Sequence, residues 1–308
     1  MHGIISIQWR KQSGRCLGLV FTKKYEFIKD PPKEIVWEEY EKVSIQEYYK
    51  LLESSSDNEA AFQLFFEENP SYVPGALELF GQSGHYPHMH TLISQPQIGG
   101  PFKRSPDFLW LANDSLTFTP VFIEIEKPAK VMYTKGGDMR AEFSQAIGQI
   151  YEWQTILNKP TNQLLFFDFF NIPQSLRERD FKPQFLLVYG RRDEYETNEL
   201  LRGKRAAVRK DNIDIMSFDR LRPIRDYYEF TSSQVRNKEY WIKNIPPTFR
   251  YRPDCAKELV SAKGFQEAIL HMRHTSEARK EFLNNRYSYW SEYGGLSDMG
   301  ILSSGEGE

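Results

Sequence analysis

Three carboxylates near the middle of the chain have the types and spacing of a divalent-cation site. Asp107 opens one short apolar stretch, and Glu124 and Glu126 lie two residues apart in a second, residues 119–127. Side chains alternate between the faces of a strand, so Glu124 and Glu126 share a face, and a neighbouring strand would bring Asp107 beside Glu124. A buried carboxylate without a partner is costly, whereas hard cations prefer carboxylate oxygen. The pattern predicts metal-assisted chemistry; a wetted strand face would be the better interpretation of an isolated Glu-x-Glu.

Three strands are predicted to position these acids. The polar turn Asn113-Asp114-Ser115 joins the last two strands, so the three form an antiparallel meander. The expected ranges are 90–95, 106–112 and 119–127.

Helices and further strands complete an α/β core around the meander. Before it, a helix from Val43 to Glu68 is predicted to break near Ser54–Asp57 and to start with Ser44 as its N-cap. Glu68 is a candidate further acid, although a glutamate in a last turn is more often solvated. After the meander, the elements expected are a helix over Met139–Leu157 carrying Gln145 and Gln149, a strand over Gln184–Tyr189, a helix over Glu194–Arg209 and a strand over Ile213–Phe218.

Composition and charge set limits on the class of protein. The chain has 308 residues and a net charge of −2, so its overall charge does not indicate a nucleic-acid partner. Cys16 and Cys255 are too few for a disulfide framework, and neither a membrane-spanning run nor a secretory signal is present. We expect a soluble cytoplasmic protein without a membrane partner.

Local basic and histidine-rich stretches have two interpretations each. The basic stretch from Arg202 to Lys210 would suit phosphate contacts, and a solvated helix face is at least as good an interpretation. His85, His88 and His90 lack the partner residues of a zinc motif, so a surface loop is favoured over a metal site.

Taken in order, these motifs resemble the Shedu family of anti-phage defence nucleases, within the PD-(D/E)XK nuclease superfamily. The resemblance covers roughly residues 45–220. The motifs that carry it are Glu68-Asn69-Pro70, Ser105-Pro106-Asp107-Phe108, Glu124-Ile125-Glu126-Lys127-Pro128 and Gln149-Ile150-Tyr151-Glu152-Trp153.

The resemblance implies a site and a mechanism. Asp107 and Glu124 would bind Mg²⁺ or Mn²⁺, which would lower the pKa of a water and stabilise charge at a scissile phosphate. Gln149 would orient this site. The family's catalytic lysine position holds Glu126, so either Glu126 acts as metal ligand or general base, or Lys127 or another lysine of the 127–135 loop replaces it, or catalysis is weak.

The predicted fold is therefore a restriction-endonuclease-like core, a mixed central sheet flanked by helices. The expected divisions are a β-rich segment at 1–40, the nuclease domain at 41–222, a mainly helical extension at 223–295 and a disordered tail at 296–308. The predicted function is a metal-dependent DNA endonuclease in bacterial anti-phage defence, and the resemblance implies a homo-oligomer, with a tetramer suggested. The alternatives are a catalytically weak module that binds DNA ends or a phage component, and a structural interaction protein.

Overall fold

The computed structural model describes residues 25–77, 85–253, 255–295 and 307–308. Residues 1–24 of the segment predicted as β-rich lie outside these ranges. Within the remainder of that segment, Tyr25 to Ile28 has no regular secondary structure. Its side chains hold it instead, because the rings of Tyr25 and Phe27 pack on Trp290.

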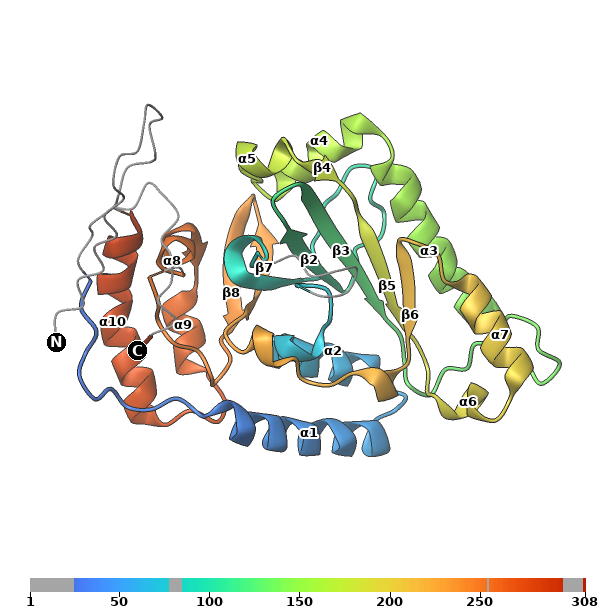
Figure 1. Cartoon of the computed structure of the whole chain (residues 1–308), viewed down its shortest axis with the longest axis horizontal. Helices are drawn as coiled ribbons and strands as arrows, with labels where there is room; N and C mark the ends of the chain where they lie inside the picture. The colour runs from blue at the N-terminus through green and yellow to red at the C-terminus, as the bar shows by residue number, and fades with distance from the viewer. Residues whose placement is uncertain (1–24, 78–84, 254, 296–306) are drawn as a thin grey trace, which may run out of the picture.

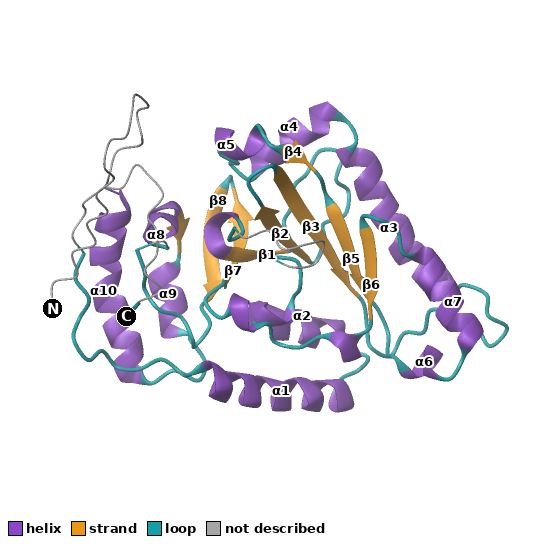
Figure 2. Ribbon diagram, viewed as in Figure 1, coloured by secondary structure: helices purple, strands orange, loops and turns teal. Residues whose placement is uncertain are grey.

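A mixed sheet runs through the described residues (Figures 1 and 2). Its order is β6-β5-β3-β2-β1-β7-β8-β9, and β4 also pairs with β3. The strands β1, β2 and β3 form the predicted antiparallel meander, which is confirmed, while β5 and β6 continue it in parallel. The strands are β1 (Thr91–Ser94), β2 (Phe108–Asn113), β3 (Thr117–Ile125), β4 (Asp180–Phe181), β5 (Gln184–Val188), β6 (Ile213–Met216), β7 (Thr231–Arg236), β8 (Glu239–Asn244) and β9 (Ala262–Lys263).

Helices cover both faces of the sheet (Figure 2). One apolar core joins α1 and α2 to one face, and a second joins α3, α4 and α7 to the other. The α-helices are α1 (Trp37–Ser54), α2 (Glu59–Glu68), α3 (Ala141–Leu157), α4 (Pro160–Phe169), α5 (Gln174–Arg177), α6 (Asp193–Glu196), α7 (Glu199–Val208), α8 (Ala256–Ser261), α9 (Phe265–Leu270) and α10 (Glu277–Gly295). The 3-10 helices are η1 (Pro70–Tyr72), η2 (His88–His90), η3 (Phe218–Arg220) and η4 (Arg225–Tyr227).

The alternation of β3 decides which face carries chemistry. Val121, Ile123 and Ile125 belong to the core under α2, whereas Phe122 belongs to the core under α3, where it packs on Trp153. Since side chains alternate along a strand, Glu124 faces α3. The predicted alternation is confirmed as far as Ile125, where β3 ends, one residue before Glu126.

Two helix starts differ from the predictions. The first helix begins at Trp37, so Ser44 is not its N-cap; its hydroxyl lies inside the helix and donates to the Glu41 carbonyl. The predicted break is confirmed, with α2 starting after Asn58, whose side chain accepts from the Ala61 N–H. The helix predicted from Glu194 is divided into α6 and α7.

The sheet does not stop at residue 222. Strand β7 pairs in parallel with β1, and β8 and β9 extend the sheet further, so the region predicted as mainly helical also contributes strands. Beyond them, α8, α9 and α10 pack together as a helical lobe at one end of the molecule (Figure 1). We call this group the C-terminal lobe. Residues 296–306 lie outside the described ranges, whereas Glu308, predicted as part of a disordered tail, exchanges two main-chain hydrogen bonds with Tyr251, which precedes this lobe.

Candidate active site

The meander and α3 bring Asp107, Glu124 and Gln149 together. Asp107 directly precedes β2, and its Oδ2 accepts a hydrogen bond from the Ile125 N–H of β3 at 2.8 Å. One residue earlier on β3, Glu124 Oε1 accepts from Gln149 Nε2 of α3 at 2.9 Å. The two carboxylates therefore meet at the end of β3, beneath the helix.

Glu124 is a half-buried acid, and one of its two carboxylate oxygens has no hydrogen-bond donor among the described residues. Its Oε2 atom is out of contact with solvent and has no hydrogen-bond partner among the described residues. Burial, followed by the charges of Asp107, Glu126 and Glu59, raises the pKa of Glu124 well above its ordinary value, and the bond from Gln149 only partly opposes this. The carboxylate is thus poised to accept a proton or a cation.

Asp107 lies in a similar environment. Burial raises its pKa from 3.8 to about 7, the bond from the Ile125 N–H opposes the rise, and the charges of Glu59 and Glu126 add to it. Two neighbouring carboxylates with raised pKa values are a feature of functional sites, because such groups destabilise the protein unless something binds them.

Glu59 is an acid of this site that the sequence did not single out. It occupies the first turn of α2, and burial together with the Glu126 charge raises its pKa. Glu68, which the sequence offered as a further acid, lies at the other end of α2 and pairs with Arg273 at 2.5 Å. The Asn58 cap marks where α2 starts, but the docking of α2 on the sheet brings Glu59 to the site, and the sequence carried no signal for it.

The lysines near Glu126 point in different directions. Lys130 forms an ion pair with the Glu126 carboxylate. Lys127 pairs with Asp57, in the turn before α2, at 3.2 Å, so it lies away from Glu124. Strand β3 pairs regularly with β2 as far as Ile123 and with β5 as far as Ile125, and it ends before Lys127.

Arg104 is a second residue that sequence reasoning missed. It is exposed, and its guanidinium donates to Gln149 Oε1 at 3.1 Å, while its carbonyl accepts from Trp153 Nε1 at 3.0 Å. The Gln149 amide is therefore oriented from both ends, with its nitrogen toward Glu124. Gln145, one turn earlier, is exposed.

The basic stretch of α7 is largely engaged in contacts within the fold. Arg205 donates to the Ile215 carbonyl at 2.7 Å, Arg209 pairs with Asp214 at 2.7 Å, and the Lys210 ammonium lies 4.4 Å from the centre of the Tyr151 ring. These contacts favour a structural role for most of the stretch.

The three histidines are dispersed. His85 contacts Ser115, His90 faces Glu258 at 4.0 Å, and burial lowers the pKa of His88 to about 4. Within the described ranges, no three His, Cys, Asp or Glu side chains form a ready-made metal-binding group, here or elsewhere.

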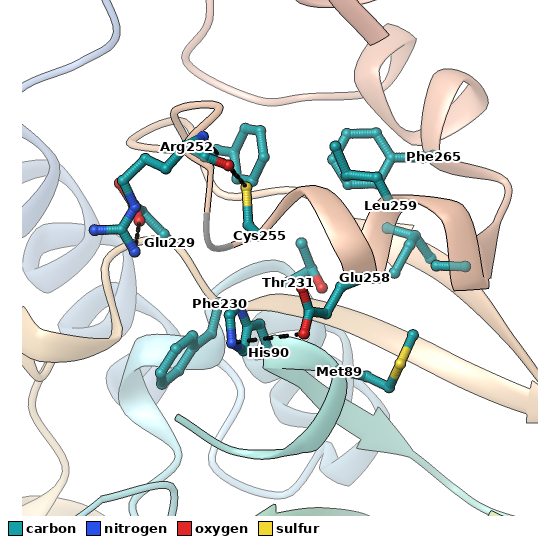
Figure 3. A pocket seen from close by; sticks show the side chains of 13 residues that line it. Met89, His90, Glu229, Phe230, Thr231, Arg252, Cys255, Glu258, Leu259 and Phe265 are labelled. Atoms are coloured by element: carbon teal, nitrogen blue, oxygen red, sulfur yellow. Dashed lines mark hydrogen bonds and ion pairs between the residues drawn. The ribbon is translucent and has the colours of Figure 1, made fainter. Parts of the chain in front are cut away.

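A small pocket lies between the sheet and the C-terminal lobe (Figure 3). His90, Glu229, Arg252, Cys255 and Glu258 contribute its polar wall, and Arg252 pairs with Glu229 at 2.6 Å. The cavity is about 30 Å³, which gives room for little more than water. It is part of the packing interface between the sheet and the C-terminal lobe rather than a substrate site.

Fold and site together define an α/β protein with a buried acidic cluster at the end of two central strands, an arrangement consistent with a nuclease-like fold. A family model described as the C-terminal part of the Shedu protein SduA matches residues 56–222, more than half of the chain. The protein therefore belongs to the Shedu family, and this membership places it in anti-phage defence. A search of curated proteins found no match. In the parts of the chain that the structure describes, every helix is too short or too polar to span a bilayer.

Proposed function

We propose that this protein is a metal-dependent DNA endonuclease of anti-phage defence, acting on phosphodiester bonds. The observation that carries the proposal is the Asp107–Glu124 pair: two adjacent, largely buried carboxylates with raised pKa values. The described residues make no ion pair with either. The acidic pair and Gln149, together with the family assignment, support a PD-(D/E)XK type of site.

The residues present fit a hard divalent cation. Mg²⁺ is usually held by one or two carboxylates together with waters and substrate phosphates, rather than by a complete cage of protein ligands. Asp107 and Glu124 supply such a pair, and the unpartnered Glu124 Oε2 is an acceptor for the ion. Glu59 and Glu126 add negative charge around the pair. A bound Mg²⁺ or Mn²⁺ would supply Lewis-acid stabilisation of the phosphate and a water of lowered pKa.

The chain's own residues would position the DNA and move protons. Gln149 holds the Glu124 carboxylate in a fixed orientation through its amide nitrogen. Arg104, exposed beside it, would bind a phosphate of the backbone. Glu126 and Lys130 form a proton-transfer pair at the place of the family's lysine: Glu126 would accept the proton of the attacking water, and Lys130 would stabilise the developing charge.

Plasmid cleavage tests this proposal. The wild-type protein should convert supercoiled plasmid to nicked or linear DNA with Mn²⁺ and not with EDTA, and Asp107→Ala and Glu124→Ala should abolish the conversion. Asp180→Asn, which changes an exposed acid of β4, is the matched control and should cleave normally. Cleavage that persists in both alanine variants would show that the site is elsewhere.

A second candidate is a module that binds DNA ends or a phage component without cutting. The observation that favours it is the position of Lys127, which is paired with Asp57, while Lys130 is neutralised by Glu126. Saturable binding of linear DNA, with no cleavage under Mg²⁺ or Mn²⁺, would establish this function instead. DNA and further copies of the chain are the partners that the proposal implies.

A further inference from the structure

Gly307 and Glu308 occupy a built site between Tyr251, residues 25–28 and α10 of the C-terminal lobe. The Glu308 N–H donates to the Tyr251 carbonyl at 3.0 Å, and the Tyr251 N–H donates to the Glu308 carbonyl at 2.7 Å. This reciprocal pair is the hydrogen-bonding pattern of a strand added to an extended segment. Such main-chain pairing is a recurrent way of binding a peptide.

Three donors from two other segments hold the Glu308 side chain. Its Oε1 accepts from Trp290 Nε1 of α10 at 2.8 Å and forms an ion pair with Arg286 of the same helix. Its Oε2 accepts from the Ile28 N–H. Glu308 is only 2% exposed, so this carboxylate is desolvated and fully compensated. Charge-assisted bonds of this kind are the strong ones and select an anion over a neutral amide.

The space around position 307 restricts the residue before Glu308 to glycine. A Cβ built on Gly307 would lie 2.7 Å from the Arg252 Cγ and 2.9 Å from the Tyr251 carbonyl oxygen. The second of these atoms is backbone and cannot move aside easily. The site therefore admits glycine followed by glutamate, and a larger residue at position 307 would displace the segment.

The walls of the site exist apart from the segment that fills it. The Arg286 guanidinium lies 3.9 Å from the centre of the Tyr289 ring and also donates to the Glu26 carbonyl at 2.7 Å. The rings of Tyr25 and Phe27 pack on Trp290. Because these contacts do not involve Glu308, the arginine and tryptophan are oriented in advance, as in a preformed binding site.

We propose that residues 25–28, Tyr251 and α10 form a peptide-binding socket that recognises the sequence Gly-Glu, with Gly307–Glu308 as its ligand bound in cis. The socket fastens the segment before α1 to the last helix through a displaceable ligand. A peptide with the same two residues would compete for it whenever the chain's own segment is weakened. This inference is independent of the nuclease proposal, because it involves none of the acids at β2 and β3.

A peptide-binding experiment on the full chain tests the socket. The probe is a fluorescein-labelled peptide with the sequence of residues 303–308, followed by fluorescence anisotropy. The Glu308→Gln chain should bind it at least about tenfold more tightly than the wild-type chain, because the wild-type segment competes at a high effective concentration. Arg286→Gln added to Glu308→Gln should remove this binding.

Altered peptides test the specificity. A probe with Gln at the position of Glu308, or Ala at the position of Gly307, should bind the Glu308→Gln chain at least about tenfold more weakly. A probe with Gln at the position of Glu306 is the charge-matched control and should keep its affinity. Equal binding of the Glu308-position and Glu306-position probes would overturn the assignment.

Hydrogen exchange on the wild-type chain tests the occupant without any substitution. The amides of Ile28 and Tyr251 donate to Glu308 and should be protected to the same extent at all protein concentrations. Rapid exchange at both amides would contradict a docked segment. Protection that disappears on dilution would show that a second copy supplies the Gly-Glu sequence, and the assignment in cis would be wrong.

Discussion

Two glutamates on opposite faces of the same sheet have opposite surroundings. Glu67 of α2 is 6% exposed, pairs with Lys243 of β8 at 2.6 Å, and also accepts from Ser94 and Gln63. Glu124 of β3 has Gln149 as its hydrogen-bond donor, and its neighbours are acids. Glu67 is compensated by the fold, whereas Glu124 is left with an unused acceptor.

This difference distinguishes a carboxylate that is paired within the fold from one that keeps an open acceptor better than burial does. Removing a charge from water is costly in both places. An ion pair and hydrogen bonds within the chain offset that cost only for Glu67. At Glu124 the raised pKa favours the neutral acid, and the cation of the proposed function would be a second way to offset the cost. Substitutions at the two places should therefore have opposite effects on stability and activity.

The largest expected effect is on catalysis at the uncompensated pair. Asp107→Asn and Glu124→Gln should each lower the plasmid cleavage rate by at least about 100-fold, because the charge stabilisation that a bound cation supplies is worth several kcal/mol. Glu67→Gln is the comparison variant and should cleave at the wild-type rate per folded molecule. Equal losses in Glu67→Gln and Glu124→Gln would remove the distinction.

The next effect is on stability at the compensated pair. Lys243→Met leaves the Glu67 charge buried and should lower the free energy of unfolding by about 2–3 kcal/mol, less than for a fully buried pair because Lys243 is 30% exposed. Urea unfolding at pH 7.5 measures it. Glu124→Gln should not destabilise the protein in the same assay; a comparable loss there would mean that Glu124 has a partner in solution.

A smaller effect is expected at the amide that orients Glu124. Gln149→Leu removes the bond to Glu124 Oε1 and the acceptor for Arg104, and should weaken Mn²⁺ binding about tenfold, at the lower end of the range for groups that orient metal ligands. Isothermal titration calorimetry measures it. Gln145→Leu, at an exposed position one turn away, is the control, and an equal loss there would point to a general disturbance of α3.

The smallest effect concerns pH. The folded-state pKa of Asp107 is raised to about 7, so ionisation costs stability as pH rises from about 4 through 7, and protons compete with a cation below 7. Mn²⁺ at ten times its dissociation constant should add about 1.4 kcal/mol of stability at pH 8. It should add little at pH 5.5. Thermal melts with and without Mn²⁺ measure the shift, and a larger shift at pH 5.5 would contradict this cause.

The sequence predicted the local part of this architecture. The meander followed from apolar alternation and the polar turn before β3, and α3 followed from its helical period. Helix α4 gave no such signal, because the exposed Leu164 and Leu165 precede the buried Phe166 and Phe167 without a helical period.

From residue patterns alone, the candidate site was predictable where its residues lie on neighbouring strands; Gln149 of α3 came from the family resemblance. Asp107 and Glu124 meet because β2 and β3 are joined by a short turn. Glu59 reaches the site because α2 docks on the sheet, and Arg104 reaches it because its carbonyl accepts from Trp153. The local spacing of residues in the sequence specifies neither arrangement. The pairing of β7 with β1 joins positions 140 residues apart, such as Thr91 and Thr231, and no periodicity specifies it.

The pairing of β1 with β7 determines where the chain can be truncated without exposing an edge of the sheet. Strand β1 lies between β2 and β7, and its four residues are all buried. A fragment ending at residue 222 would leave the main-chain donors and acceptors of β1 open along one side and would also remove Lys243 from Glu67. Open strand edges recruit other chains. Such a fragment should aggregate, and the residues after 222 act as the cover that keeps this sheet from growing.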